Sequence, residues 1–464
     1  MAYYILSEGC LLRGYKKLPY GISYPKPFCH TDFFDKEEYE LILDCNGETD
    51  ITEEELSAKQ KIIFKELLEK DAIHECEKGT KYDSGQEYVF YPVAYKSSAQ
   101  WSVTGRCNYL CKHCFLSAPS YKGEDLSLEK CNYILDQLNE CGIRNVSLTG
   151  GEPLVYKDLS GLLRSISNHD INITVIYTNG ALVNERLLDE LESLNFKPVF
   201  KVSFDGVGWH DWLRGIDGAE KKAIDAIKLL KSRGYSVHIA MVLHKKNLKS
   251  VPETIKLLGE LGCDFIRMII IDQWGNWAEH QDDNLTEKEA MDFILDYLPR
   301  FYKDGAPLSV RFGNFIRFDK ETRSFSLQLE EENYDNNGNI PACDTLKKDI
   351  YISDDGKILP CMVFHGLPIE NELDSVFDKP LKDIINDSPY TKYSTVTCRE
   401  CTEHNEECRS CKYKRICHAG CRALAYQEDD HDYYGVHKTL CYCFKNGYYE
   451  KAKELIEQLE KNNS

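Results

Sequence analysis

Residues 101–114 read Trp101-Ser-Val-Thr-Gly-Arg-Cys107-Asn-Tyr-Leu-Cys111-Lys-His-Cys114, so a short apolar strand candidate runs directly into three closely spaced cysteines. A loop at the carboxyl end of a barrel strand faces the mouth where active sites lie. Three thiolates in such a loop can hold three corners of a four-iron, four-sulfur cube and leave one iron without a protein ligand. A closed zinc site is the alternative, but it needs four ligands, and the nearest fourth candidate, His113, lies inside the loop. We therefore predict an iron–sulfur cluster with one open iron.

The region that follows alternates strand and helix patterns. Strands are predicted at residues 101–103, 145–148, 173–177, 199–203, 236–242 and 265–271. Helices are predicted at residues 126–140, 185–194, 219–233 and 250–261, with a closing helix at 282–302. Six strand–helix units favour an α/β fold of the partial (β/α)6, TIM-like barrel type over a doubly wound sheet, and spacing alone leaves both open.

The length of 464 residues is too great for one compact core. We place a winged-helix-like domain at 1–90, the partial barrel at 98–305, a bridging region at 306–340 and a cysteine-rich iron–sulfur domain at 341–464. Residues 327–339 are acidic and rich in Asn, which is typical of a linker. Little apolar periodicity follows residue 340, so metal sites are expected to order that last domain.

Charge and hydropathy exclude several classes of partner. The formal net charge of −19 argues against a surface that neutralises nucleic-acid phosphates. No apolar run approaches the roughly 18 residues that span a bilayer, and the N-terminus lacks the pattern of a secretory signal. We therefore expect a cytoplasmic protein without nucleic-acid or membrane partners.

Twenty cysteines in a reducing compartment point to metal ligation for those that cluster, because disulfides are rare there. Ten of them lie between Cys343 and Cys443 in short repeats. Seven others are scattered singly, and we interpret these as ordinary buried thiols: Cys10, Cys29, Cys45, Cys76, Cys131, Cys141 and Cys263.

The N-terminal domain combines short strands with two helices. Strands are predicted at 3–6, 11–15, 73–75 and 88–91. One helix, at 34–43, follows Asp32 as a candidate N-cap, and another, at 52–70, begins with a capping-box spacing from Thr52 to Glu55. A winged-helix layout could bind DNA, but this segment has more acid than base and no basic recognition helix.

The CxxxCxxC spacing of Cys107, Cys111 and Cys114 after the first strand resembles the signature of the radical S-adenosylmethionine (radical SAM) superfamily. The superfamily usually has an aromatic residue before the third cysteine, where this chain has His113. The resemblance implies that S-adenosylmethionine binds the open iron and yields a 5′-deoxyadenosyl radical.

Other landmarks of that superfamily follow the predicted strands. Gly150-Gly151-Glu152-Pro153 resembles the loop that binds the methionine amino group, and paired glycines let backbone approach a ligand closely. Further cofactor-binding candidates lie at the ends of later strands: Asn179, Ser203 for the ribose, Asp205, and Arg214 for the methionine carboxylate. Alternatively, Arg214 bridges local acids such as Asp211 or Asp217.

The C-terminal cysteines resemble the SPASM extension, which carries auxiliary iron–sulfur clusters. The resemblance implies two ligand sets: Cys343, Cys361, Cys398 or Cys401, and Cys421 for one cluster; Cys408, Cys411, Cys417, and Cys441 or Cys443 for the other. Within each pair, spacing does not select the ligand. A pair of zinc knuckles is the competing interpretation.

Residues 1–88 resemble the leader-peptide recognition domain of maturases that act on ribosomally made peptides. The resemblance rests on Leu12-Arg-Gly14, Phe34-Asp-Lys-Glu-Glu-Tyr39, Asp44-Cys-Asn-Gly47 and Leu67-Leu-Glu-Lys70. Such domains bind an extended peptide as an added strand.

Together these resemblances imply a peptide maturase with S-adenosylmethionine and three 4Fe–4S clusters, one of radical SAM type and two auxiliary. The expected partners are a precursor peptide with a leader segment and an electron donor such as flavodoxin or ferredoxin. A sulfur-to-carbon thioether is the leading product. Carbon–carbon crosslinking, epimerisation, sulfatase-maturase-like oxidation and a non-enzymatic iron–sulfur peptide carrier are the alternatives. No catalytic acid or base is identified.

Overall fold

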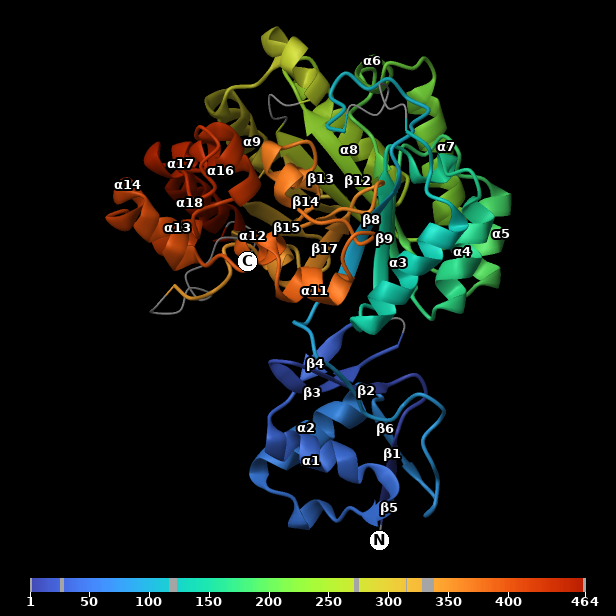
Figure 1. The fold of residues 1–464 in the computed structure, drawn as a ribbon. Helices are drawn as coiled ribbons and strands as arrows, with labels where there is room; N and C mark the ends of the chain where they lie inside the picture. Colours follow the sequence, from blue (N-terminus) through green and yellow to red (C-terminus); the bar gives the residue numbers. More distant parts are fainter. Residues whose placement is uncertain are drawn as a thin grey trace.

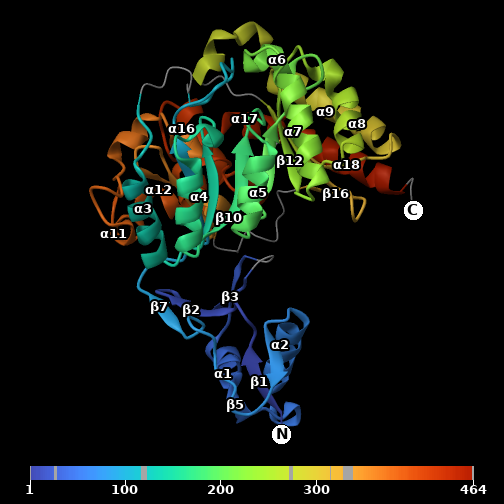
Figure 2. The same cartoon turned by 90° about the vertical axis from the view of Figure 1, so that its right-hand side faces the viewer.

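The computed structural model describes residues 2–25, 29–116, 123–270, 275–313, 315–327 and 338–461. A small N-terminal unit, blue in Figure 1, lies below a large sheet, and the C-terminal segment, orange to red, lies against the flank of that sheet (Figures 1 and 2).

The N-terminal unit contains two small sheets and two helices around its own core. One sheet has the order β5-β1-β6 and the other β4-β3-β2-β7. Its strands are β1 (Tyr3–Leu6), β2 (Leu11–Tyr15), β3 (Leu18–Ser23), β4 (Thr31–Phe33), β5 (Asn46–Asp50), β6 (Ile73–Cys76) and β7 (Val89–Tyr91). Its helices are α1 (Lys36–Asp44) and α2 (Ala58–Glu69), and the elements enclose a separate apolar cluster.

The predicted starts of both helices were wrong. Helix α1 is capped by Asp35, whose carboxylate accepts from a backbone N–H of the first turn, whereas Asp32 lies in β4 and pairs with a lysine. Helix α2 begins after Ser57, which forms a capping box with Gln60. The hydroxyl of Thr52 caps no helix and precedes only a short 3-10 turn. A capping-box spacing alone did not distinguish the two Ser/Thr positions.

The large sheet is a partial barrel. Its central strands run parallel in sequence order: β8 (Ser98–Thr104), β9 (Asn145–Gly150), β10 (Asn172–Thr178), β11 (Val199–Ser203), β12 (Val237–Leu243), β13 (Phe265–Ile270) and β14 (Ser309–Phe312). A doubly wound sheet would reverse its order at a switch point, and this sheet does not. The strand β17 (Asp349–Ile352) adds a parallel neighbour to β8. Antiparallel strands β15 (Ile316–Asp319), β16 (Ser324–Leu327) and β18 (Ile358–Leu359) form the ends.

Helices cover the outer face of this sheet (Figure 2). They are α3 (Leu128–Glu140), α4 (Leu159–Asn168), α5 (Glu185–Ser193), α7 (Ala219–Ser232), α8 (Val251–Glu260) and α9 (Glu287–Lys303). Alternate strand residues such as Phe200 and Val202 are fully buried against them, whereas Lys201 and Ser203 on the inner face keep partial solvent access. The strand and helix predictions agree with this arrangement to within a few residues, except that α4 and the short α6 (His210–Arg214) were not predicted.

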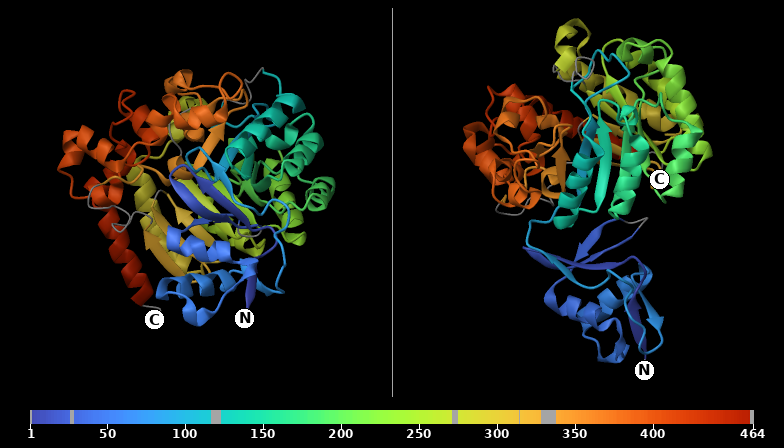
Figure 3. Two further views of the ribbon diagram at one scale, coloured as in Figure 1. Left: turned by 60° about the horizontal axis from the view of Figure 1, so that its bottom comes forward. Right: turned by 45° about the vertical axis from the view of Figure 1, so that its right-hand side comes forward.

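The C-terminal segment spans both edges of the open sheet (Figure 3). Strand β17 pairs with β8 at one edge, and α18 (Tyr448–Lys461) packs on β16 and α9 at the other. Between them lie the short helices α10 (Asp344–Lys348), α11 (Leu381–Asn386), α12 (Pro389–Ser394), α13 (Cys398–His404), α14 (Glu406–Arg409), α15 (Lys414–Cys417), α16 (Arg422–Glu428) and α17 (Lys438–Lys445). Most of the predicted linker at 327–339 lies outside the described residues. Residues 309–327, which the sequence assigned to a bridging region, prolong the sheet.

Among the described residues, no helix combines the length and apolar character that crossing a bilayer demands.

Candidate active site

The three cysteines of the loop after β8 lie together. Cys107, Cys111 and Cys114 share one packed cluster with Tyr109 and Ala219, and none of the three forms a disulfide. The backbone N–H of Tyr109 points at the Cys107 sulfur over 3.5 Å, and burial raises the pKa of that thiol to about 12. A thiol in this environment stays protonated until a metal displaces the proton. Three convergent soft donors and no fourth cysteine in the loop fit a cluster with an open iron.

The short helix α6 anchors this loop from one side. The N–H of Leu110 donates to the carbonyl of Arg214 over 3.2 Å, and the N–H of Lys112 donates to Leu213 over 2.9 Å. Gly215 follows with φ +66°, and a Cβ there would lie 2.4 Å from the Leu110 carbonyl oxygen. Only glycine permits this contact, so the sequence of α6 helps to fix the cysteine loop.

The loop at Gly150-Gly151-Glu152 runs beside the residues that lead into Cys107. Gly151 and Glu152 donate their N–H groups to the carbonyls of Thr104 and Arg106, each over 2.9 Å. A Cβ on Gly150 or Gly151 would lie 2.2 Å from those same carbonyl oxygens. The close approach that requires both glycines is therefore to the cysteine-bearing chain itself, which couples the two loops.

Glu152 is buried and ties β9 to β10. Its carboxylate accepts from the N–H of Asn179 over 2.7 Å, from the Thr178 hydroxyl over 2.8 Å and from the N–H of Leu154 over 3.2 Å. Burial raises the pKa of Glu152 to about 7 in spite of these bonds. Because a carboxylate offers about four acceptor sites, one remains for a ligand.

Asn179 extends this network to the cysteine loop. Its Nδ2 donates to Oδ1 of Asn108 over 2.7 Å, and Asn108 directly follows Cys107. The loops after β8, β9 and β10 thus form one hydrogen-bonded unit. The sequence analysis missed Asn108, although its position inside the cysteine motif was the available signal.

Asp205 and Arg214 form a buried ion pair beside the cluster loop. Nε of Arg214 lies 2.6 Å from Oδ2 of Asp205, and Nη1 lies 3.8 Å from the sulfur of Cys111. Burial opposes ionisation of Asp205, but the Arg214 guanidinium and His210 hold the pKa of Asp205 well below its usual range. His210, also missed from the sequence, has Nδ1 3.1 Å from the same carboxylate.

The acid that holds Arg214 is thus Asp205, not Asp211 or Asp217. Asp211 instead accepts the N–H groups of Gly218 and Glu220 at the start of α7. Ser203 lies at the end of β11, half-buried on the inner face and in register with Ala240. The predicted cofactor-binding residues therefore lie around the cysteine loop, at or just after the ends of β9, β10 and β11, except Arg214, which ends α6.

In the C-terminal segment, one set of neighbouring cysteines surrounds Cys361. Burial, then Cys421 and Cys343, raises the pKa of Cys361. Cys398 lies within electrostatic reach of Cys343, and burial raises the pKa of the Cys398 thiol to about 12. Cys398 interacts more strongly with Cys401 than with Cys343, and Cys401 interacts in addition with Arg422 and Cys408.

A second set of neighbouring cysteines lies between α14 and α17. Burial, followed by Cys441, Cys408 and Cys411, raises the pKa of Cys417 to about 12. Cys443 is only 4% exposed and packs in the core near Glu287 of α9. Of the two alternatives that the sequence left open, Cys441 interacts with Cys417 and Cys408, whereas Cys443 interacts with Glu287 and with Cys441.

In the part of the chain that the structure describes, no three His, Cys, Asp or Glu side chains gather closely enough to hold a single metal ion.

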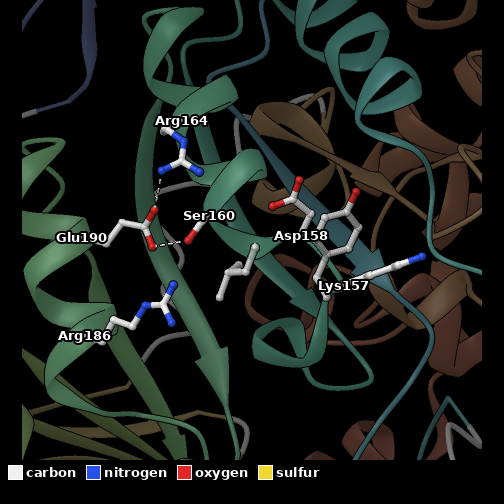
Figure 4. A pocket seen from close by; sticks show the side chains of 8 residues that line it. Lys157, Asp158, Ser160, Arg164, Arg186 and Glu190 are labelled. Carbon is white, nitrogen blue, oxygen red and sulfur yellow. Dashed lines mark hydrogen bonds and ion pairs between the residues drawn. The ribbon is translucent and has the colours of Figure 1, made fainter.

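A surface pocket of about 570 Å³ lies between α4 and α5, outside the barrel mouth (Figure 4). Its acid Glu190 accepts from Ser160 over 2.5 Å and pairs with Arg164 over 3.3 Å. These three groups satisfy one another, and none of the predicted site residues lines this pocket.

Two family models match the chain. The model of the Radical SAM superfamily matches residues 101–258, and that of the SPASM iron–sulfur cluster-binding domain matches residues 343–412.

Curated relatives of two kinds are similar over most of their length. The AdoMet-dependent heme synthase of Methanosarcina barkeri is 24% identical over 334 residues, covering 70% of this chain and 91% of the relative. The antilisterial bacteriocin subtilosin biosynthesis protein AlbA of Bacillus subtilis is 24% identical over 441 residues, covering 91% of this chain and 90% of the relative.

Among solved structures, SuiB of Streptococcus suis bound to S-adenosylmethionine superposes with a TM-score of 0.65 at 18% identity. The match covers 94% of this chain and 99% of SuiB. SuiB bound to its precursor peptide SuiA superposes with a TM-score of 0.64. The α/β fold with a large central parallel sheet is thereby confirmed.

Proposed function

We propose that this chain, a radical SAM enzyme with a C-terminal SPASM domain, installs a thioether between a cysteine sulfur and a carbon of a ribosomally made peptide. S-adenosylmethionine, one 4Fe–4S cluster and auxiliary clusters are its cofactors. The similarity to the subtilosin protein supports the peptide assignment because it covers 91% of the chain, whereas that to the heme synthase covers 70%. A match over 91% of the chain must include part of the N-terminal unit, whereas a match over 70% need not.

The cofactor would bind among the strand ends described above. We assign the methionine amino group to the remaining acceptor site of Glu152 and the methionine carboxylate to the free edge of the Arg214 guanidinium. Asp205 keeps Arg214 charged and fixes its orientation, and Ser203 is positioned for the ribose. When bound, the cofactors supply one-electron chemistry that removes a hydrogen atom from a substrate carbon.

The peptide would dock on the N-terminal unit at β7. This strand pairs only with β2 among the described strands, so its other edge presents backbone donors and acceptors. Tyr88, Val89 and Phe90 are 42%, 39% and 49% exposed, an unusual apolar run for an edge strand. A leader segment that adds as a further strand would satisfy the backbone and cover these side chains.

Two auxiliary clusters complete the assignment. We assign one to Cys343, Cys361, Cys398 and Cys421, and the other to Cys408, Cys411, Cys417 and Cys441. Thioether formation breaks one C–H and one S–H bond and forms one C–S bond. One hydrogen atom leaves the carbon, the thiol proton leaves to water, and one electron remains. An auxiliary cluster held by either set of four cysteines would supply the acceptor for that electron, since cluster potentials span a wide range.

Mass spectrometry of a peptide encoded beside the enzyme's own gene tests this function. Reduced, reconstituted enzyme should give a product lighter by two hydrogen atoms that no longer reacts with iodoacetamide at the linked cysteine. A product of the same reduced mass that still takes up iodoacetamide would establish a carbon–carbon crosslink instead. An unchanged mass in water with uptake of one deuteron in heavy water would establish epimerisation.

A further inference from the structure

A row of arginines crosses the inner face of the barrel at the level of Ser203. Ser203 is in register with Ala240, Ala240 with Arg267, Arg267 with Arg311, and Arg311 with Arg317, on the consecutive strands β11 to β15. Residues in register on neighbouring strands project from the same face of a sheet. The row therefore begins at the cofactor mouth and continues as three adjacent cations.

The intervening residues show that these arginines face inward. On β13 and β14, Ile266, Met268, Val310 and Phe312 are buried against the outer helices, whereas Arg267 and Arg311 are half-buried. The inner face thus carries the cations and keeps some solvent access, unlike the packed interior of a closed barrel.

Lys201 adds a fourth cation to this face. It lies two residues before Ser203 on β11, so it projects from the same side, and its Nζ lies 5.0 Å from the centre of the Tyr177 ring. Burial, followed by Arg267 and Arg311, lowers the pKa of Lys201 to about 8. The two arginines therefore add to burial in opposing protonation of the lysine. We call Lys201, Arg267 and Arg311 the inner cationic patch.

The described residues supply little negative charge to this patch. Among the described residues, no carboxylate lies within ion-pair distance of Lys201 or Arg267, and Nε of Arg267 is buried without a hydrogen-bond partner. By contrast, the surface residue Arg233 pairs with three carboxylates: Glu185, Asp189 and Glu192. In a protein of net charge −19, acids are plentiful, so their absence beside Lys201 and Arg267 is specific to the inner face.

The patch is costly without a ligand. Like charges directly opposite each other on neighbouring strands are destabilising, and partial burial increases the cost because the charged forms lose solvation. Features that oppose stability locally are expected where function requires them. An anion bound on the inner face would offset both the repulsion between the cations and their loss of solvation.

We propose that the inner cationic patch binds a carboxylate of the substrate peptide, so that the segment to be modified carries an Asp or Glu close to the reacting carbon. This inference rests on the proposed function, since it takes the substrate to be a peptide. Guanidinium groups match carboxylates in planar, bidentate geometry. Along β11, Lys201 lies about 6.6 Å from Ser203, and an extended peptide advances about 3.3 Å per residue. The acidic residue should therefore lie within about two residues of the modified carbon.

Peptide binding to the reconstituted enzyme with S-adenosylmethionine tests the proposal. The probes are fluorescein-labelled copies of the precursor peptide encoded beside the enzyme's own gene, in which each Asp or Glu is replaced singly by Asn or Gln. Fluorescence anisotropy gives the affinity of wild type, Arg267→Gln, Lys201→Gln and the surface control Arg186→Gln. Formation of 5′-deoxyadenosine without peptide checks that each variant is loaded and folded.

One acidic position should stand out. Its replacement should weaken binding to wild type by about tenfold to a hundredfold, the range expected for a lost charge-assisted hydrogen bond. Arg267→Gln should bind the acidic and the neutral peptide equally, whereas Arg186→Gln should behave as wild type. The proposal would be overturned if replacing the acidic residue of the peptide reduced affinity equally for wild type and both patch variants. It would also be overturned if no Asp or Glu replacement changed the affinity for wild type.

The same measurement separates this inference from the proposed function. Affinity reports the carboxylate contact whatever bond is formed afterwards, so a carbon–carbon product with an intact acid dependence would refute only the thioether. Iron–coproporphyrin III, which also carries carboxylates, is the third probe. If its absorbance change on binding were abolished by Arg267→Gln while the peptide affinities were not affected, the patch would serve a tetrapyrrole and the peptide assignment would be wrong.

Discussion

The Nε atom of Arg214 lies 2.6 Å from Oδ2 of Asp205, and both side chains are buried beside the sulfur of Cys111. This pair joins the end of β11 to the segment that anchors the cysteine loop, so it supports the site structurally as well as electrostatically.

Asp205→Asn should strongly destabilise the protein. The substitution leaves the Arg214 guanidinium buried without a full counter-charge, and breaking such a pair costs about 3–5 kcal/mol of unfolding free energy. Anaerobic thermal unfolding of the reconstituted protein measures the loss. Asp217→Asn is the matched control because Asp217 is exposed on the same segment. Equal effects of the two substitutions would contradict a special role for the pair.

Affinity for S-adenosylmethionine should rise with pH through Glu152. Burial raises the pKa of Glu152 to about 7, so at lower pH the carboxyl group is neutral and cannot pair with an ammonium group. We expect the dissociation constant to fall between about pH 5.5 and about pH 7.5, below the range where an α-amino group of pKa about 7.7–8.0 loses its proton. Equilibrium dialysis measures it.

Glu152→Gln should remove this pH dependence. Its one amide oxygen can still accept from the N–H of Asn179, while its NH2 group can donate to the Thr178 hydroxyl oxygen. The raised pKa of Glu152 also determines how the stability of the cofactor-free protein changes with pH. A buried carboxyl group with a raised pKa opposes folding increasingly as pH rises from its unfolded pKa of about 4.3 toward 7. The substitution should therefore lessen the loss of stability over that interval, and an unchanged pH profile of both quantities would exclude Glu152.

Cys441 and Cys443 should behave differently although they are two residues apart. Cys441→Ser removes a proposed ligand, so the reconstituted protein should lose up to one four-iron cluster. Cys443→Ser alters a buried thiol in the core and should retain the iron, with a loss of about 1 kcal/mol in unfolding free energy. Iron and sulfide analysis with electron paramagnetic resonance distinguishes them. Iron loss from Cys443→Ser alone would reverse the assignment.

The sequence predicted the fold well where the periodicity of apolar residues and the sequence motifs indicate the same element. Val199–Ser203 was placed to the residue, because a short β-branched run between helices admits one interpretation. The choice between Cys441 and Cys443 could not be predicted, since it depends on how α17 is rotated against α9. The inner cationic patch was equally hidden, because Lys201, Arg267 and Arg311 become neighbours only through strand register.

Arg422 should tune both auxiliary clusters. It is 1% exposed and donates to the carbonyls of Tyr433 and Gly435 over 3.2 and 3.0 Å, so its charge is fixed in place. It opposes the burial-driven rise in pKa of thiols in both sets, among them Cys398 and Cys417. A cation at about 10 Å and an effective dielectric constant of about 20 contributes about 1.7 kcal/mol. Because a one-electron couple shifts by about 59 mV for each factor of ten, Arg422→Met should lower both auxiliary reduction potentials by roughly 70 mV.

The conservative variant separates charge from folding. Arg422→Lys keeps the positive charge but loses the forked contacts, so its potentials should shift by less than half as much, while its thermal stability should fall as in Arg422→Met. The cluster at Cys107, Cys111 and Cys114 has Arg214 as its neighbouring cation, so its potential should stay constant in both variants. Redox titrations followed by electron paramagnetic resonance resolve the clusters. Equal shifts in Arg422→Lys and Arg422→Met would mean that the residue acts through packing, because only a change of charge distinguishes the two substitutions electrostatically.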